Sequence, residues 1–571
     1  MQEARMRRML LVAVALSALA ASPDPPASPD PKAKIDALFQ EFDGSDSPGC
    51  ALGVFRDGKV AYARGYGMAN LELGVANSPQ TVFDIGSTSK QFSAFAIQLL
   101  ARDGKLSLDD DIRKWVPEIP SYGKIVTIRH LLHHTGGLRD YIELMSLQGV
   151  MTEDLTGDAD VLDIMSLQKA PNFAPGEEYV YCNTGYFLLS VIVKRASGKS
   201  LRDFAAERIF APLGMSHTQF NDSHTRIIPG RATGYSKAKD GGFGIDMSDW
   251  EQTGDGSVLT TIEDLQRWDQ NFYDPKVGDT KLLEAMLTTG VLNSGKKLDY
   301  ASALRVATYR GLPAVSHGGS WAGYRAQLVR FPEQKFSVAC LCNNGGTANP
   351  SRLAHQVAEV YLGGLMKKEE SRAEGEKAGE EARLAPSRAE IQRLAGAYRN
   401  AESGQLVTLS IKDGKLAADV GGTAYMLVAT APNRFHLTGG PLGIRSEAEF
   451  DAARGTRSPM RVTTTYDDGE VETESFAPVE RWAPTAGELE QLAGKYASAE
   501  LDTTWRLAEE GGKLYIRHRG MPDKPLEPTV AGVFTLDGMN LSFTRNAAGK
   551  PAGFVLDAGR VRGVTFVAQS L

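Results

Sequence analysis

The final third of this 571-residue chain contains an internal repeat, which restricts what this part can fold into. The segment AEIQRLAGAY at 389–398 returns as GELEQLAGKY at 487–496, an offset of 98 residues, and Gly-Lys-Leu at 414–416 returns at the same offset. Each unit consists of short alternating runs separated by Gly and Asp turns, which is typical of small antiparallel barrels. The repeat predicts two β-barrel domains, over residues 387–483 and 484–571.

The block before the repeat, residues 34–366, has strand-like runs at both of its ends. Early in the block, Cys50–Arg56 and Lys59–Gly65 flank the turn dipeptide Asp-Gly, and late in the block a second pair of runs ends at Cys342. Helical patterns fill the middle of the block. We therefore expect an α/β (α+β) layered domain whose single sheet is built from both ends of the block.

The two segments outside these domains have their own signatures. Three arginines within the first eight residues precede an apolar run that ends in small residues, which predicts a signal peptide over residues 1–21. A Pro-rich tether follows over 22–33, and residues 367–386 form a linker dense in charged residues. We expect a periplasmic or secreted protein without stable membrane insertion after cleavage.

Composition excludes several partners. The net charge is −7 and there is no basic excess, so no nucleic-acid partner is expected. His130, His133 and His134 form a cluster, but it lacks the glutamate of a zinc-protease motif and a third ligand. No metal or other cofactor is predicted.

Four cysteines do not form a disulfide framework in so long a chain. Cys340 and Cys342 share one face of a strand, where a bridge between them has poor geometry. We expect the cysteines to be small buried side chains. Export would also allow pairing with Cys50 or Cys182.

Ser87-Thr88-Ser89-Lys90 precedes a helical apolar stripe, so Ser87 is expected at a helix N-terminus with Lys90 one turn later. This arrangement suits nucleophilic catalysis, because a serine needs a neighbouring group to take its proton and an oxyanion is favoured at a helix N-terminus. Alone, the same residues could be an ordinary helix cap.

Two further motifs follow along the chain. Tyr181-Cys182-Asn183 would place a phenol and an amide on one side of an extended segment, although a structural tyrosine before a helix is the favoured explanation of this motif alone. His317-Gly318-Gly319-Ser320 lies on a late strand, where glycines allow a substrate to approach the backbone. A lone histidine there is more often part of a core.

Taken together, the order and spacing of the three motifs resemble the superfamily of serine β-lactamases and penicillin-binding proteins, within its class C β-lactamase-related branch. The resemblance covers residues 34–365. Further phrases that support it are LLHHTGGL at 131–138, PLGM at 212–215 and SVLTTIEDL at 257–265. The two repeats resemble the lipocalin-like eight-stranded barrels of the D-aminopeptidase branch.

The resemblance implies a role for each motif residue. Ser87 would be the acylated nucleophile, Lys90 would promote proton loss from Ser87 and Tyr181, and Tyr181 would pass the proton to the leaving group. The remaining implied roles are a carbonyl contact from Asn183, an oxyanion hole from the amides of Ser87 and Ser320 beside Gly319, and the third-motif position for His317.

The chain departs from the family pattern at two positions. His317 stands where β-lactamases and transpeptidases have a lysine, which removes the fixed cation that meets a substrate carboxylate. Asp255 stands where relatives have a small residue, and it would either bind a substrate ammonium or serve as a plain turn residue. In D-aminopeptidase a loop of the last barrel reaches the active site, but the sequence does not identify this loop.

The predicted function is a serine hydrolase that forms an acyl-enzyme on small amides or short peptides, most similar to D-aminopeptidase. Alternatives with the same machinery are a carboxylesterase, a β-lactamase, or a cell-wall or β-lactam sensor that is acylated without turnover. The sequence predicts no oligomeric state.

Overall fold

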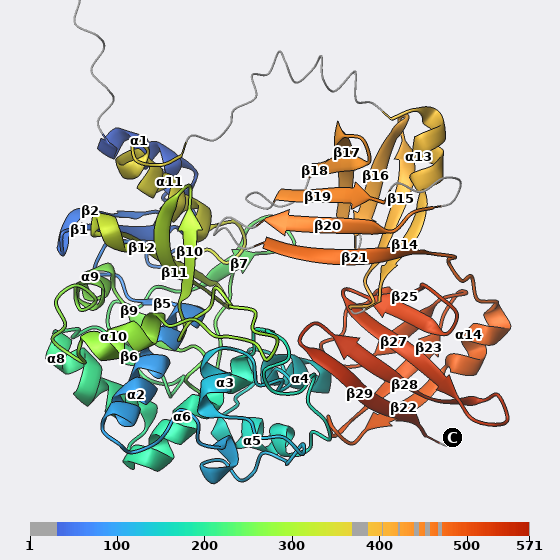
Figure 1. Cartoon of the computed structure of the whole chain (residues 1–571), viewed down its shortest axis with the longest axis horizontal. Coiled ribbons are helices and arrows are strands. Elements are labelled where there is room, and N and C mark those ends of the chain that lie inside the picture. The colour runs from blue at the N-terminus through green and yellow to red at the C-terminus, as the bar shows by residue number, and fades with distance from the viewer. Residues whose placement is uncertain are drawn as a thin grey trace, which may run out of the picture.

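The computed structural model describes residues 31–367 and 386–569, except for 402, 421–422, 439–444, 452–456 and 466–470 (Figure 1). An α/β domain is followed by two barrels, which lie beside it in Figure 1. The predicted signal peptide, most of the tether and most of the linker lie outside the described residues. The tether was predicted to extend to residue 33, but helix α1 begins at Pro31.

One six-stranded antiparallel sheet forms the centre of the first domain, in the order β10-β11-β12-β13-β1-β2. Its strands come from both ends of the domain, which confirms the prediction. They are β1 (Cys50–Arg56), β2 (Lys59–Tyr66), β10 (Arg305–Tyr309), β11 (Leu312–Trp321), β12 (Tyr324–Phe331) and β13 (Phe336–Cys342).

Strands β1 and β13 are almost entirely apolar because both faces of the sheet are covered. Leu52 and Val54 face the layer formed by α1 and α11, whereas Ala51 and Phe55 face the larger helical layer. The helices are α1 (Pro31–Leu38), α2 (Lys90–Arg102), α3 (Ile128–Leu132), α4 (Tyr141–Gln148), α5 (Asp158–Ser166), α6 (Asn183–Ser197), α7 (Leu201–Ala205), α8 (Ala211–Leu213), α9 (Ile262–Gln270), α10 (Thr280–Leu287) and α11 (Pro350–Leu362).

Short elements connect these layers. The strands are β3 (Met68–Asn70), β4 (Val75–Ala76), β5 (Phe83–Asp84), β6 (Gln219–Phe220), β7 (Tyr235–Lys237), β8 (Phe243–Ile245) and β9 (Val258–Thr260). The single-turn helices are η1 (Gln40–Phe42), η2 (Gly86–Ser89), η3 (Ile112–Lys114), η4 (Ala206–Phe210) and η5 (Pro332–Gln334).

Each repeat forms a closed barrel of eight antiparallel strands, which confirms the predicted barrels. The first consists of α13 (Arg388–Leu394), β14 (Gly396–Asn400), β15 (Leu406–Lys412), β16 (Lys415–Val420), β17 (Thr423–Ala431), β18 (Arg434–Thr438), β19 (Arg445–Phe450), β20 (Met460–Thr465) and β21 (Val471–Val479). The second consists of α14 (Ala486–Leu492), β22 (Gly494–Ser498), β23 (Thr503–Glu509), β24 (Leu514–Arg517), β25 (Pro525–Pro528), β26 (Val533–Leu536), β27 (Met539–Arg545), β28 (Pro551–Ala558) and β29 (Val561–Ala568).

The repeated sequence makes the same contacts in both barrels. Ser387 and Thr485 each begin the short helix with a capping box. The tyrosine that ends the repeat then turns back, so that Tyr398 donates to the Leu394 carbonyl and Tyr496 to the Leu492 carbonyl, both at 2.9 Å. The motif therefore fixes a capping helix on each barrel.

The second barrel packs tightly against the first domain. Its apolar residues belong to the same buried cluster as the helical layer, whereas the first barrel has a core of its own. The Trp505 indole donates to the Leu147 carbonyl at 3.1 Å. This continuous core fixes the second barrel relative to the first domain.

The cysteines differ from their expected state. Cys182 and Cys340 are free and buried, as predicted, but Cys50 and Cys342 form a disulfide. The two bridged residues lie directly opposite each other on β1 and β13. The sequence could not reveal this pairing, because it depends on the register between strands 292 residues apart.

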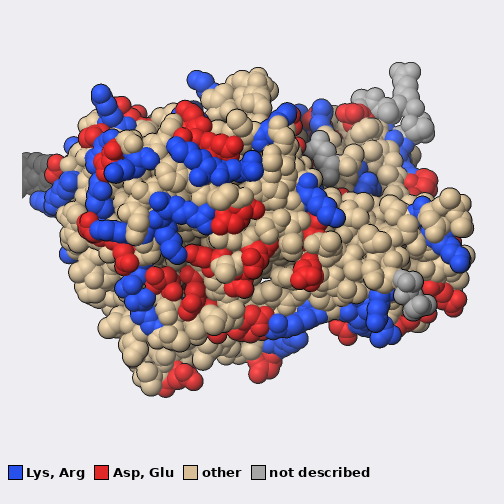
Figure 2. All heavy atoms as spheres, turned by 90° about the horizontal axis from the view of Figure 1, so that it is seen from below, with Lys and Arg blue, Asp and Glu red and all other residues tan. Residues whose placement is uncertain are grey.

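Charges of both signs are interspersed on the face shown in Figure 2, across the first domain and the barrels. This face presents no single-sign field of the kind that attracts a polyanion. Among the described residues, no helix combines the length and apolarity needed to cross a bilayer.

Candidate active site

Ser87 lies in the single turn η2, directly before α2 begins at Lys90. The predicted position at a helix N-terminus is therefore correct to within one turn. Gly86 precedes the serine with φ +47°, and a Cβ on it would lie 2.7 Å from the Ser320 amide nitrogen. The absence of a side chain at Gly86 allows η2 and β11 to approach each other.

Lys90 connects the motifs. Its side chain is fully buried, and its Nζ donates to Ser87 Oγ at 3.0 Å, Asn183 Oδ1 at 2.8 Å and the Asp255 carbonyl at 2.6 Å. An ammonium has three N–H donors, so these acceptors satisfy all of them. Residues far apart in the chain therefore meet at one buried amine.

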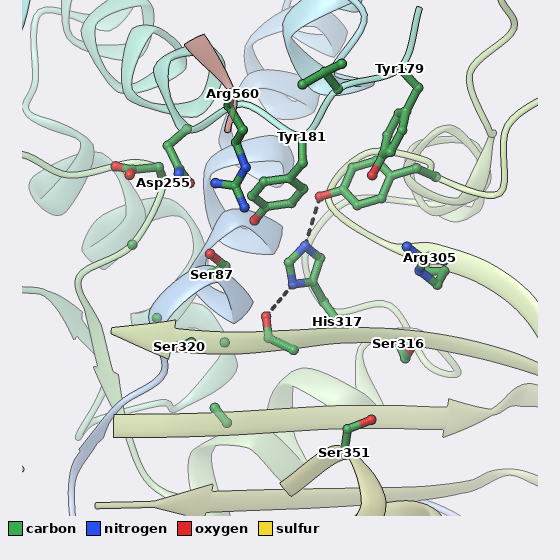
Figure 3. A pocket seen from close by; sticks show the side chains of 18 of the residues that line it. Ser87, Tyr179, Tyr181, Asp255, Arg305, Ser316, His317, Ser320, Ser351 and Arg560 are labelled. Atoms are coloured by element: carbon green, nitrogen blue, oxygen red, sulfur yellow. Dashed lines mark hydrogen bonds between the residues drawn. The ribbon is translucent and has the colours of Figure 1, made fainter. Parts of the chain in front are cut away.

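The ring of Tyr181 lies close to this amine, and the Tyr181 hydroxyl makes no hydrogen bond within the described chain. Lys90 Nζ is 5.0 Å from the centre of the Tyr181 ring, and the His134 ring packs against the Tyr181 ring in a tilted arrangement, with 4.2 Å between the ring centres. The Tyr181 hydroxyl is buried and has no hydrogen-bond partner in the described chain. In Figure 3 it points toward Ser87. The hydroxyl is thus free to exchange a proton with a reacting group.

His134 supports this arrangement. It adopts φ +57°, and its Nδ1 accepts a hydrogen bond from the Cys182 amide at 3.1 Å. Burial lowers the pKa of His134 well below its usual range, and the charge of Lys90 lowers it further. The ring is therefore neutral and orients the segment that carries Tyr181.

Asn183 begins helix α6, and Asp140 orients it. One Asp140 carboxylate oxygen accepts from the Asn183 backbone amide at 2.7 Å and from its side-chain amide at 2.9 Å. These contacts direct the Asn183 side-chain oxygen toward Lys90. No pattern in the sequence indicated a role for Asp140, which lies 43 residues before Asn183.

Strand β11 packs directly on the turn that carries the serine. A Cβ on Gly319 would lie 1.9 Å from the Ile85 carbonyl oxygen, and Thr88 donates to the His317 carbonyl at 3.3 Å. This close approach brings Ser320 beside Ser87, as Figure 3 shows. The predicted oxyanion-hole residues are therefore neighbours.

His317 is buried between a tyrosine and its own strand. Its Nε2 is 2.9 Å from the Tyr300 hydroxyl, and its Nδ1 is 2.6 Å from the Gly318 carbonyl. Burial lowers the pKa of His317 to about 3, and the charge of Lys90 contributes. His317 is consequently neutral near pH 7 and supplies no cation in place of the missing lysine.

Asp255 lies on the opposite side of Ser87 from His317 (Figure 3). Burial raises the pKa of its carboxyl to about 6, although the charge of Lys90 and a hydrogen bond from Tyr141 oppose this shift. The Tyr141 hydroxyl donates to the carboxylate at 3.0 Å. Asp255 is therefore an anion at neutral pH that faces the cavity.

Residues of the three motifs line a cavity of about 1530 Å³, to which all three domains contribute. Seven of the predicted residues line it: Ser87, Tyr181, Asn183, Asp255, His317, Gly319 and Ser320. The eighth, Lys90, is buried beneath them and bonded to Ser87. Both barrels contribute as well, the first through the start of β21 and the second through Arg560.

Arg560 occupies the turn between β28 and β29 of the second barrel, and it identifies the barrel loop that the sequence could not. Its amide donates to the Glu143 carboxylate, and its carbonyl accepts from Asn172 at 2.7 Å. Its guanidinium lies 5.0 Å from the centre of the Tyr181 ring and points into the cavity (Figure 3).

The profile of the family described as Beta-lactamase matches residues 35–362. The chain is 27% identical over 487 residues to the D-aminopeptidase of Cereibacter sphaeroides, covering 85% of this chain and 86% of that protein. It is 26% identical over 561 residues to the D-aminopeptidase of Brucella melitensis, covering 94% and 98%. It is also 30% identical to Penicillin-binding protein 4* of Bacillus subtilis, covering 54% and 70%.

The fold is similar to that of a solved structure. The octameric penicillin-binding protein homologue from Pyrococcus abyssi superposes with a TM-score of 0.54 at 24% identity, covering 78% of this chain and 99% of that one. This likeness concerns the fold alone.

Proposed function

Because this chain belongs to the beta-lactamase family of serine-type hydrolases, we propose that it hydrolyses amides and short peptides that begin with a D-residue. The observation that carries the proposal is the bonding of Lys90 to Ser87, Asn183 and the Asp255 carbonyl beneath the unengaged Tyr181 hydroxyl. The D-aminopeptidase relatives, one of which covers 94% of this chain, support an amide substrate.

In the proposed reaction, the Ser87 oxygen attacks the substrate carbonyl as its proton passes to the Tyr181 oxygen. This step requires Tyr181 to act as a phenolate, and the positive charges of Lys90 and Arg560 lie against its ring. The carbonyl oxygen becomes an oxyanion between the amides of Ser87 and Ser320. Tyr181 then returns the proton to the leaving nitrogen, and the C–N bond breaks.

Water completes the cycle. Tyr181 takes a proton from a water molecule, the water oxygen attacks the Ser87 ester, and the proton returns to the Ser87 oxygen as the acyl group leaves. Throughout, Lys90 keeps its three hydrogen bonds and stabilises the negative charge that develops around it.

Asp255 supports a substrate with a free amino group. Asp255 lines the cavity, and its backbone carbonyl accepts a hydrogen bond from the Lys90 amine that also contacts Ser87. An ammonium on the residue before the scissile bond would meet the Asp255 carboxylate there. The neutral His317 supplies no cation on the strand where β-lactamases have a lysine.

We also propose that the protein is exported. The Cys50–Cys342 disulfide supports this, since such bridges persist in oxidising compartments and are rare in the cytosol.

One comparison tests the reaction. Wild type and Ser87→Ala are assayed on D-alanyl and L-alanyl anilides, an aryl ester and a chromogenic cephalosporin, with Ser351→Ala as a control serine from the same cavity. The proposal predicts preferential cleavage of the D-anilide, lost in Ser87→Ala and retained in Ser351→Ala. Cleavage that survives in Ser87→Ala contradicts it, and ester turnover alone, cephalosporin turnover or stoichiometric acylation without turnover favours the corresponding alternative.

A further inference from the structure

We propose that Arg560 of the second barrel forms a carboxylate-binding subsite in the catalytic cavity. The preferred substrates would then carry a carboxylate close to the scissile amide, in addition to the free amino group. This inference rests on the proposed amide hydrolysis and names a substrate class for it.

The Arg560 guanidinium donates no hydrogen bond to the described part of the chain. The nearest carboxylate oxygen, on Asp140, is 3.7 Å from Nη1, and the same oxygen already accepts two hydrogen bonds from Asn183. A charge-assisted hydrogen bond would be about 2.7–2.9 Å long. The planar donor fork is therefore available to an incoming anion.

The guanidinium is also held in place. The Arg560 backbone is bonded on both sides, by Glu143 and by Asn172, and the guanidinium lies over the Tyr181 ring. Its side chain is 41% exposed, toward the cavity. A fixed fork loses little conformational entropy when it binds a planar carboxylate with two hydrogen bonds.

The other two arginines that line the cavity are engaged within the protein. Arg305 donates to Asp299 at 2.9 Å, and Arg325 donates to the carbonyls of Ala322 and Tyr324, each at 2.7 Å. Because His317 is neutral as well, Arg560 is the arginine of the described cavity lining whose guanidinium is left to meet a substrate anion.

The position of Arg560 indicates where the carboxylate lies. Tyr181 protonates the leaving nitrogen in the proposed reaction, and Arg560 lies against the same ring. In an amino-acid leaving group, one carbon separates the nitrogen from the α-carboxylate, so both can be reached together. A side-chain carboxylate on the N-terminal D-residue is the second source of the same chemistry.

Matched substrates distinguish these sources. D-Alanylglycine is compared with D-alanylglycinamide, and the D-glutamyl with the D-glutaminyl anilide, by kcat/KM. We expect the carboxylate to be favoured about 10- to 100-fold within the first pair, as for hydrogen bonds between charged groups, and this ratio to disappear in Arg560→Gln. If only the D-glutamyl anilide is preferred over its D-glutaminyl partner, and this preference depends on Arg560, the subsite is supported and binds a side-chain carboxylate of the N-terminal residue. Equal rates within both wild-type pairs, or an unchanged ratio in Arg560→Gln, overturn the subsite.

Arg562→Gln is the matched control. Arg562 lies in the same turn region and pairs with Glu178 at 3.1 Å, so its loss changes the charge of the hairpin but should preserve the substrate ratio. If Arg562→Gln also abolishes the preference for the carboxylate substrate, the preference arises from the overall charge of the hairpin, and the subsite is refuted.

Binding to the Ser87→Ala protein makes the test independent of turnover. Calorimetry should show tighter binding of D-alanylglycine than of the glycinamide, with the difference lost in Ser87→Ala/Arg560→Gln. If that difference is present although wild type cleaves no D-alanyl substrate, the subsite stands and the proposed reaction fails. If cleavage occurs without any Arg560-dependent difference, the reaction stands and the subsite fails.

Discussion

Arg139 of the first domain and Glu500 of the second barrel form an ion pair at 2.6 Å, in which the two side chains are only 2% and 4% exposed. The same guanidinium donates to the Arg562 carbonyl at 2.9 Å, two residues beyond Arg560. The Glu500 carboxylate also accepts from the Lys169 amide at 3.0 Å. This buried pair therefore links the docking of the second barrel to the residues around Arg560.

Breaking this pair should be costly. Removing one partner of a buried ion pair typically destabilises a protein by about 3–5 kcal/mol, because the other charge stays buried without compensation. Glu500→Gln should lower the free energy of unfolding by that order, as measured by urea denaturation. The control is Arg519→Gln, which breaks the exposed interface pair with Asp154 and should cost less than about 1 kcal/mol. Equal effects of the two variants would show that the buried pair has no special role.

Glu143 should make the free energy of unfolding depend on pH. Burial raises its pKa from 4.5 to about 7, with nearby Asp140 adding to the shift, while the Arg560 amide and charge oppose it. The folded protein therefore binds this proton more tightly than the unfolded chain does, and stability should fall as pH rises from about 4.5 to 7. In Glu143→Gln this decline should be smaller. Denaturation curves at several pH values test it, and an identical slope in wild type and variant would refute it.

Asp255 should make the catalytic rate rise with pH, whereas Glu143 should make the stability fall with pH. Its pKa of about 6 means that the carboxylate forms as pH rises through 6, so kcat/KM for a D-alanyl anilide with a free amine should rise over that range. Asp255→Asn should lower kcat/KM by about 10- to 100-fold and remove the Asp255 step from the profile. An N-acetylated substrate, which has no ammonium, should show little effect of Asp255→Asn. An equal loss on both substrates would instead assign Asp255 a structural role.

Gly319→Ala should reduce activity through the oxyanion hole. A Cβ there would lie 1.9 Å from the Ile85 carbonyl, so β11 must move away from Ser87. Loss of one oxyanion donor typically costs about 10²–10³-fold in kcat. Gly244→Ala, where the added Cβ meets nothing within 4 Å, is the control. Full activity in a folded Gly319→Ala protein would exclude this strand from the oxyanion site.

Local patterns predicted much of the fold. The apolar stripe of α2, the hairpin around Asp57-Gly58 and the repeated helix-to-tyrosine segment each depend on neighbouring residues, and the structure has them where they were expected. The three catalytic motifs could be assembled only through their resemblance to a family, because each alone has a simpler explanation.

The remaining features depend on long-range geometry. The partner of Cys342 is set by strand register across most of the first domain, and Arg560 reaches Tyr181 only after a barrel has closed and docked. Neither residue has a local signal in the sequence. A search for charged residues in the tight turns of the last barrel would have selected Arg560 as one of several candidates.

The proposed acylation of Ser87 during hydrolysis of a D-amide can be tested by mass spectrometry of protein that is mixed with a D-alanyl anilide, quenched in acid and digested. We expect an alanyl adduct on the peptide that contains Ser87. The adduct should decay as substrate is exhausted, and both the adduct and hydrolysis should be absent in Ser87→Ala. Hydrolysis that persists in Ser87→Ala, or an adduct on another residue, would contradict the proposed acylation.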